Sequence, residues 1–94
     1  MATSTIKQLL KIIEIPSSEF TWHNATKQFV SSNTHQPPTG QKLLGFMVTC
    51  TNSGGTIMSG TYGSSGYEVH VGGINPDGTL INDTYHFRCY MILM

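Results

Sequence analysis

The stretch PPTGQKLLGF (residues 37–46) sets the architecture expected for this chain. Two prolines and a glycine interrupt the backbone, and an apolar run then begins within KLLGFMVTC (42–50). Proline has no amide hydrogen to donate to a sheet, so it lies where strand pairing ends. We therefore interpret residues 37–40 as a corner that ends one strand and starts the next.

Period-two alternation predicts the strands around this corner. In residues 42–50 both faces are largely apolar, which is typical of a strand covered on both sides. YEVHVGGI (67–74) alternates apolar with polar residues and predicts a half-buried antiparallel strand. TYHFRCYMILM (84–94) alternates to the last residue, so we expect the chain to end inside a strand.

Turn chemistry separates these runs. NSGG (52–55) and YGSSGY (62–67) are rich in glycine and serine. NPDG (75–78) places proline second, aspartate third and glycine last, which predicts a type I turn closing a hairpin. Residues 20–30 predict a further hairpin that turns at residues 23–25.

The first residues allow two interpretations. TIKQLLKIIEI (5–15) fits a short helix with a capping box, yet its isoleucines and the proline at position 16 favour a strand over 7–15. We divide the chain into an N-terminal strand or short helix, possibly an assembly segment (1–17), and a β-sandwich domain (18–94).

The predicted fold class is all-β, an antiparallel β-sandwich that is jelly-roll-like. Its expected core comprises Leu44, Phe46, Val48, Val69, Val71, Phe87 and Cys89. Cys50 and Cys89 are expected on neighbouring strands, as buried thiols or, in an oxidising compartment, as a disulfide.

Composition excludes several functions. Charged residues are 11% of the chain and only five are Lys or Arg, so no basic groove for nucleic acid is expected. No apolar stretch approaches 18 residues and no basic leader precedes one, so neither membrane insertion nor a secretory signal is expected.

Catalysis, metals and cofactors are not expected either. No serine motif of the hydrolase kind and no carboxylate pair fixed by spacing is present, so we predict that the protein is not an enzyme. His70 and His86 would be neighbours if their strands pair, with Glu68 as a third ligand. A solvated polar face is the favoured interpretation of these residues.

Sugar binding suits the composition better, because aromatic rings stack on sugars while amides, carboxylates and hydroxyls orient them. Core packing remains an alternative for the single tryptophan. The predicted ligand-binding residues are Trp22, His23, Asn24, Tyr62, Tyr67, Asn82 and Asp83.

The order of these phrases carries a resemblance. PPTGQKLLG leads into an apolar strand, a Gly/Ser-rich hairpin and YEVHVGGIN follow, and YMILM closes the chain. This resembles the small C-terminal β-sandwich domains of phage tail-fibre and baseplate-tip proteins over roughly residues 18–94. Gln41 and Lys42 stand where the family often has an aromatic residue.

The resemblance implies a virion protein, assembled in the host cytoplasm, that binds other virion proteins and a host-surface glycan or protein. It also implies a homotrimer with loops 52–55, 62–67 and 75–83 facing outward. The aliphatic surface predicts the subunit contact near Ile12, Ile13, Ile15, Met91 and Leu93. The alternative function is a carbohydrate-binding β-sandwich module of cellular origin.

Overall fold

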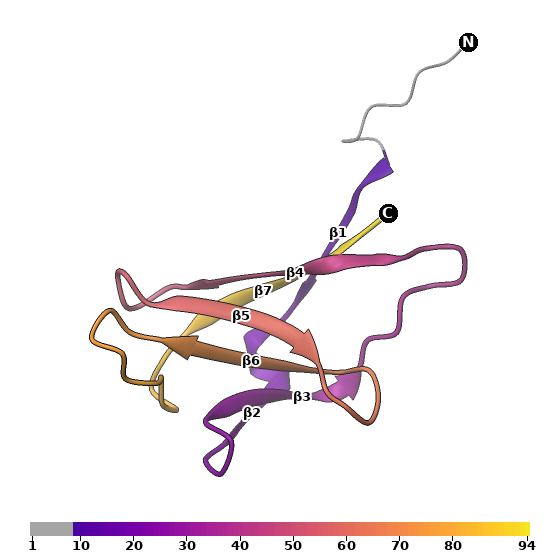
Figure 1. Cartoon of the computed structure of the whole chain (residues 1–94). Coiled ribbons are helices and arrows are strands. Elements are labelled where there is room, and N and C mark those ends of the chain that lie inside the picture. Colours follow the sequence, from indigo (N-terminus) through magenta and orange to yellow (C-terminus); the bar gives the residue numbers. More distant parts are fainter. Residues whose placement is uncertain (1–8) are drawn as a thin grey trace.

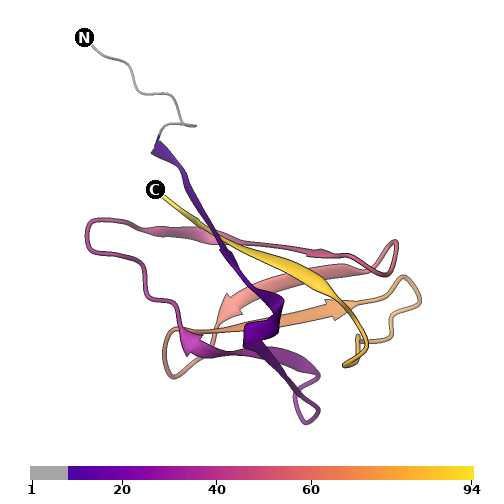
Figure 2. The same ribbon diagram turned by 180° about the vertical axis from the view of Figure 1, so that it is seen from behind.

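Two antiparallel sheets lie face to face in the computed structural model, which describes residues 9–94 (Figures 1 and 2). One sheet has the strand order β1-β7-β4 and the other has the order β2-β3-β6-β5. The predicted all-β antiparallel sandwich is confirmed. The elements are β1 (Lys11–Ile15), the 3-10 helix η1 (Ser17–Glu19), β2 (Phe20–His23), β3 (Gln28–Thr34), β4 (Leu43–Cys50), β5 (Ile57–Tyr62), β6 (Glu68–Ile74) and β7 (Phe87–Leu93).

The corner at residues 37–40 carries the chain from one sheet to the other, between β3 and β4. The Gln41 amide donates to the Pro38 carbonyl at 3.0 Å. Gly40 has a φ of 85°, a conformation that L-residues avoid, so glycine is needed there. Two backbone hydrogen bonds between Lys42 and Met94 (2.9 and 3.0 Å) then start β4 beside β7.

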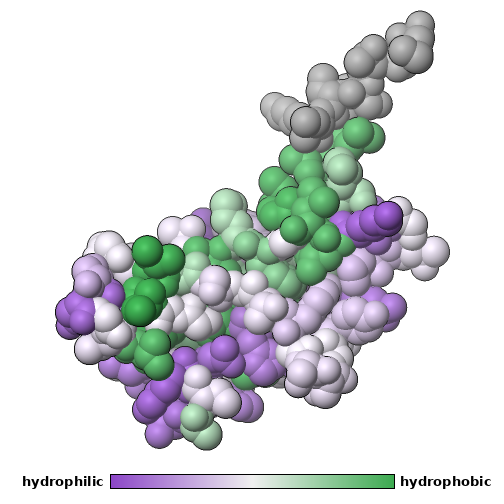
Figure 3. Space-filling view, in the orientation of Figure 1, coloured by the Kyte–Doolittle hydropathy of each residue, from purple (hydrophilic) through white to green (hydrophobic). Residues whose placement is uncertain are grey.

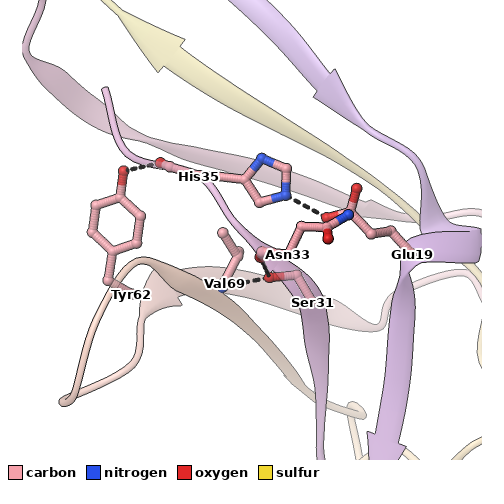
Figure 4. Close-up of polar contacts among 6 residues, drawn as sticks. All are labelled: Glu19, Ser31, Asn33, His35, Tyr62 and Val69. Atoms are coloured by element: carbon pink, nitrogen blue, oxygen red, sulfur yellow. Dashed lines mark hydrogen bonds and ion pairs between the residues drawn. The ribbon is translucent and has the colours of Figure 1, made fainter. Parts of the chain in front are cut away.

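His35, just before this corner, forms hydrogen bonds with η1 and with the residues that flank the β5–β6 loop (Figure 4). Its ring bonds the carboxylate of Glu19 in η1, and its amide donates to the Tyr67 carbonyl at 2.8 Å. The Tyr62 hydroxyl donates to the His35 carbonyl at 2.7 Å. Burial, with Tyr67 nearby, raises the pKa of Tyr62, which therefore stays a hydrogen-bond donor.

A bulge between Val30 and Thr34 interrupts the pairing of β3 with β6. Ser31 satisfies the backbone there, because its buried hydroxyl donates to the Asn33 carbonyl (2.7 Å) and accepts from the Val69 amide (2.8 Å). Both bonds are drawn in Figure 4. A buried polar side chain is thus paired rather than stranded.

The core lies between the sheets and centres on β7, the middle strand of the three-stranded sheet. Phe87 packs against Phe20 and Phe29, with ring centroids 5.1 and 5.0 Å apart. Inward residues of the second sheet, including Val69 and Val71, are fully buried against it. The buried apolar side chains are Ile15, Phe29, Met58, Val69, Val71, Ile81, Phe87, Cys89, Met91 and Leu93.

Most of the predicted core is confirmed, but Leu44 is wrong. Val69, Val71, Phe87 and Cys89 are buried, and Phe46 and Val48 pack against the core while half-buried. Leu44 is 54% exposed. A bulge is the reason: Leu43 pairs with Leu93 while Gly45 pairs with Ile92, so the extra residue shifts which side chains face inward.

The prediction that β4 is covered on both faces is also wrong for the folded chain. Leu43, Phe46 and Val48 face the core, whereas Met47 is 51% exposed on the outer face. No described element covers this outer face of the β1-β7-β4 sheet. Its apolar side chains are therefore left at the surface.

The N-terminal prediction is confirmed in part. Lys11–Ile15 forms a strand paired antiparallel with β7, so the helix alternative is wrong there. Residues 1–8 lie outside the described residues. Ile15, Met91 and Leu93, predicted near a subunit contact, are buried in the chain's own core. Ile12 is 58% exposed, and Ile13 is half-buried against the core.

The predicted turns occur near the expected places. β2 pairs with β3, and the hairpin turns at residues 24–27. In the NPDG turn, the Gly78 amide donates to the Asn75 carbonyl at 2.9 Å, and Gly78 has a φ of 87°. A bridge between Ile74 and Leu80 closes that hairpin as predicted. The described residues contain no helix long and apolar enough to cross a membrane.

The two cysteines are free thiols on paired strands, β4 and β7. Cys50 lies opposite Phe87, while Cys89 lies opposite Val48, so the two thiols are offset along the strands. Cys89 is fully buried, and burial raises the pKa of its thiol to about 11. Cys50 is only half-buried.

Phe87→Ala tests the central role of β7. Removing this buried ring should lower the free energy of unfolding by about 3–5 kcal/mol, measured by urea denaturation. Ile57→Ala is the matched control, because Ile57 is 70% exposed and its truncation should change stability by less than about 0.5 kcal/mol. Equal losses in the two variants would contradict the assigned core.

Thiol labelling tests the environment of the cysteines. At pH 8, iodoacetamide should modify Cys50 and leave Cys89 unmodified, since the thiolate is the nucleophile and Cys89 is protonated far below a pKa of about 11. Mass spectrometry of tryptic peptides gives the two extents of labelling. In urea both should react, and labelling of Cys89 at the same rate as Cys50 in native protein would refute its burial.

Candidate functional site

Three hollows adjoin at one end of the sandwich, which we call the loop end (residues 14–18, 51–53 and 82–88). The largest has a volume of about 670 Å³ and is lined by Glu14, Pro16, Ser17, Ser18, Thr51, His86, Phe87 and Arg88. The second, about 260 Å³, is lined by Asn52, Ser53, Asn82, Thr84 and Tyr85. The third, about 230 Å³, is lined by Ser17, Ser18, Phe29, Asp83, Tyr85, His86 and Phe87.

Local hydrogen bonds shape the loop that precedes β7. The Asn82 side-chain oxygen accepts from the Thr84 amide at 2.9 Å, a turn that asparagine forms readily. The Tyr85 amide donates back to the Asn82 carbonyl at 3.3 Å. These bonds turn the chain at Asn82 and direct the next residues toward the strand.

Asn52, in the turn after β4, holds the same loop from the other side. Its side-chain oxygen accepts from the His86 amide at 2.8 Å, and its amide nitrogen donates to the Thr84 carbonyl at 3.0 Å. The Thr51 amide donates to the His86 carbonyl at 2.9 Å. Hydrogen bonds therefore hold the loop on both sides. A ligand that binds there would lose little free energy to ordering the loop.

Tyr85 is the aromatic residue of the loop end. It packs against the core and also lines the second and third hollows, so part of the ring remains accessible. An amphipathic ring that packs against the core and also lines a hollow is a suitable contact for a sugar ring. Hydroxyls and amides surround it, as sugar recognition requires.

The charges of the loop end are few and mixed. Glu14, His86 and Arg88 line the largest hollow, and Asp83 lines the third. All four residues are exposed. Ser17 and Ser18 lie between these charged groups because they line both hollows.

The structure divides the predicted ligand-binding residues among separate places. Asn82 and Asp83 lie at the loop end, in the second and third hollows. Tyr62 and Tyr67 flank the β5–β6 loop at the opposite end of the sandwich (Figures 1 and 2). Their ring centroids are 5.2 Å apart, and Tyr67 is 41% exposed.

Trp22 follows the core-packing alternative. Its half-buried ring packs edge-to-face against Phe29 with centroids 4.9 Å apart. His23 and Asn24 are exposed at the β2–β3 hairpin, where Asn24 accepts a hydrogen bond from Lys27 at 2.8 Å. None of these three predicted ligand residues lines the hollows described above.

The suggested neighbourhood of His70 and His86 is wrong, because β6 and β7 belong to different sheets. His70 instead lies 3.1 Å from the Gln28 side-chain oxygen and 3.8 Å from Glu68. Backbone hydrogen bonding, supported by Ser65 and His70, lowers the pKa of Glu68. In residues 9–94 no three His, Cys, Asp or Glu side chains gather in a metal-binding arrangement.

The ligand-binding residues predicted from the sequence do not include five residues of this site: Ser17, Ser18, Asn52, Tyr85 and Arg88. Asn52 and Thr84 are 32 positions apart, so no local sequence pattern predicts the hydrogen bond between them. Asn82 and Asp83, which the sequence does predict, are local signals because amides and carboxylates at a turn suit sugar binding.

Comparisons with protein-family models, with curated proteins and with solved structures find no match to this chain. Its function is therefore inferred from the geometry of the loop end and from the exposed surfaces.

Proposed function

We propose that this protein is a non-catalytic adhesive module that binds a surface glycan through the loop end. The observation that carries the proposal is the prearranged loop at residues 82–86, held by Asn52 and Asn82, with Tyr85 between two hollows. A preordered polar surface with one accessible aromatic ring matches the needs of a neutral, hydroxyl-rich ligand.

The chemistry of the lining supports binding rather than turnover. Glycoside hydrolysis needs two carboxyl groups on either side of one bond. The two carboxyl groups of the loop end, Glu14 and Asp83, line different hollows. Asparagine, serine and threonine supply most of the remaining polar atoms, and these residues orient hydroxyl groups without activating them.

Assembly forms the second part of the proposal: a homotrimer in a virion, together with other virion proteins, as the resemblance to phage tail-fibre tips implies. The outer face of the β1-β7-β4 sheet supports self-association. Half-buried Tyr90 lies opposite exposed Met47 on β4, and half-buried Ile92 lies opposite exposed Ile12 on β1, whereas Glu14, the β1 partner of Tyr90, adds a charge to this face. The exposed apolar residues there are Ile12, Leu44, Met47 and Met94, which are 58%, 54%, 51% and 48% exposed.

Figure 3 shows hydrophobic residues gathered where β1 leaves the body of the molecule. Such continuous apolar surface usually marks an interface. With charged residues at only 11%, identical subunits approach with little mutual repulsion. Glu14 and Arg88 lie toward the loop end of this same face, so we propose that the contact is centred on Ile12, Met47 and Met94 and leaves the loop end uncovered.

Asp83→Ala tests the glycan site. On a glycan array that includes host-surface oligosaccharides, we expect the wild-type protein to bind and the variant to bind at least about tenfold more weakly, a loss of about 1.4 kcal/mol. Asp77→Ala is the matched control, since Asp77 is exposed in the 75–78 turn but lines none of the three hollows. Equal weakening by both variants, or no binding by wild type, would contradict the proposal.

Met47→Asp tests the assembly surface. Sedimentation equilibrium at micromolar concentration should give a trimer for the wild type and a monomer for the variant, because an aspartate would be desolvated in the contact. Ile57→Asp serves as the comparison, since Ile57 is exposed in the other sheet. A wild-type monomer that still binds glycans would favour a cellular carbohydrate-binding module instead of a fibre tip.

A further inference from the structure

Arg88 lines the largest hollow and pairs with no carboxylate of the described part of the chain. Its strand neighbours Phe87 and Cys89 are buried, so Arg88 points outward and is exposed. Within residues 9–94 the only ion pairs join His35 to Glu19 and His70 to Glu68. The guanidinium therefore keeps its five donors available at the loop end.

The surroundings of Arg88 supply further polar groups. Thr49 lies opposite Arg88 on β4. The hollow itself adds the hydroxyls of Ser17, Ser18 and Thr51 and the ring of His86. A planar, permanently charged fork bordered by hydroxyls is the arrangement that binds a carboxylate on a hydroxylated ligand.

We propose that the largest hollow binds the carboxylate of an acidic sugar, of the uronic or sialic acid class, with Arg88 as its counter-charge. This inference rests on the proposed glycan-binding function and names its ligand class. The carboxylate accepts two hydrogen bonds from the guanidinium, while the hydroxyls of Ser17 and Ser18 meet those of the sugar ring. Tyr85 and Asp83, in the adjoining hollow, would contact the next sugar unit.

Glu14 limits how much negative charge the hollow accepts. It lines the same hollow and lies opposite Tyr90, two positions along β7 from Arg88. A ligand with one carboxylate per sugar places its charge at Arg88 and leaves Glu14 solvated. A densely sulfated chain would bring further charges against Glu14, so the site should prefer carboxylated to sulfated glycans.

Matched probes test the proposal by isothermal titration calorimetry. The probes are sialyllactose, which has a single carboxylate followed by neutral sugar units, and its methyl ester, which share the sugar skeleton and differ in charge. Wild-type protein should bind the acid at least about tenfold more tightly than the ester. In Arg88→Gln this preference should vanish, while Lys42→Gln, which removes an exposed cation outside the three hollows, should retain it.

Two further measurements complete the test. Glu14→Gln leaves Arg88 in place and should tighten binding of the acid several-fold, and weaker binding would overturn the assigned geometry. A heparin oligosaccharide should bind no more tightly than the acid, and tighter binding would instead indicate a general anion site. The result that overturns this inference alone is equal binding of acid and ester with both affinities still lowered by Asp83→Ala. Binding of neither probe class, with a blank glycan array, would overturn the proposed function as well.

Discussion

The inward alternation of β7 is the constraint on which the rest of this structure depends. β7 pairs with β1 on one side and β4 on the other, and four of its side chains are buried between the sheets. A slip of one residue would turn Arg88 and Tyr90 into the core and expose Phe87 and Cys89. Because that exchange would bury a charge, the register of the whole three-stranded sheet is fixed.

The candidate site follows from this register. Phe87 faces inward at the start of β7, so Arg88, the next residue, must face outward. The loop at residues 82–86 therefore ends where the core begins. Asn52 then joins this loop to the turn after β4, because β4 and β7 are paired. The proposed ligand surface is thus supported by hydrogen bonds between the Asn52 side chain and the main chain of the loop, and by the packing of the aromatic cluster beneath it.

Two surfaces of the molecule are free for different tasks. The loop end is polar and prearranged, whereas the outer face of the β1-β7-β4 sheet, away from Glu14 and Arg88, is apolar and uncovered by described residues. The bulge at Leu44 contributes to this division, because it moves a leucine from the expected core to the outer face. Because Glu14 and Arg88 lie where the two surfaces meet, assembly and adhesion are compatible only if the contact stays on the apolar part of the sheet, near Ile12 and Met47.

Local chemistry in the sequence determined the strands, the hairpins and the corner at residues 37–40, because alternation and turn residues act over a few positions. Only the tertiary structure decided which faces meet. The aliphatic composition predicts Ile15, Met91 and Leu93 near a subunit contact, yet pairing of β1 with β7, nearly the full length of the chain apart, buries their side chains in the core. The bulge at Leu44 and the meeting of Asn52 with the loop after Asn82 depend equally on long-range pairing. No periodicity encodes such contacts, since their energy exists only once distant strands lie side by side.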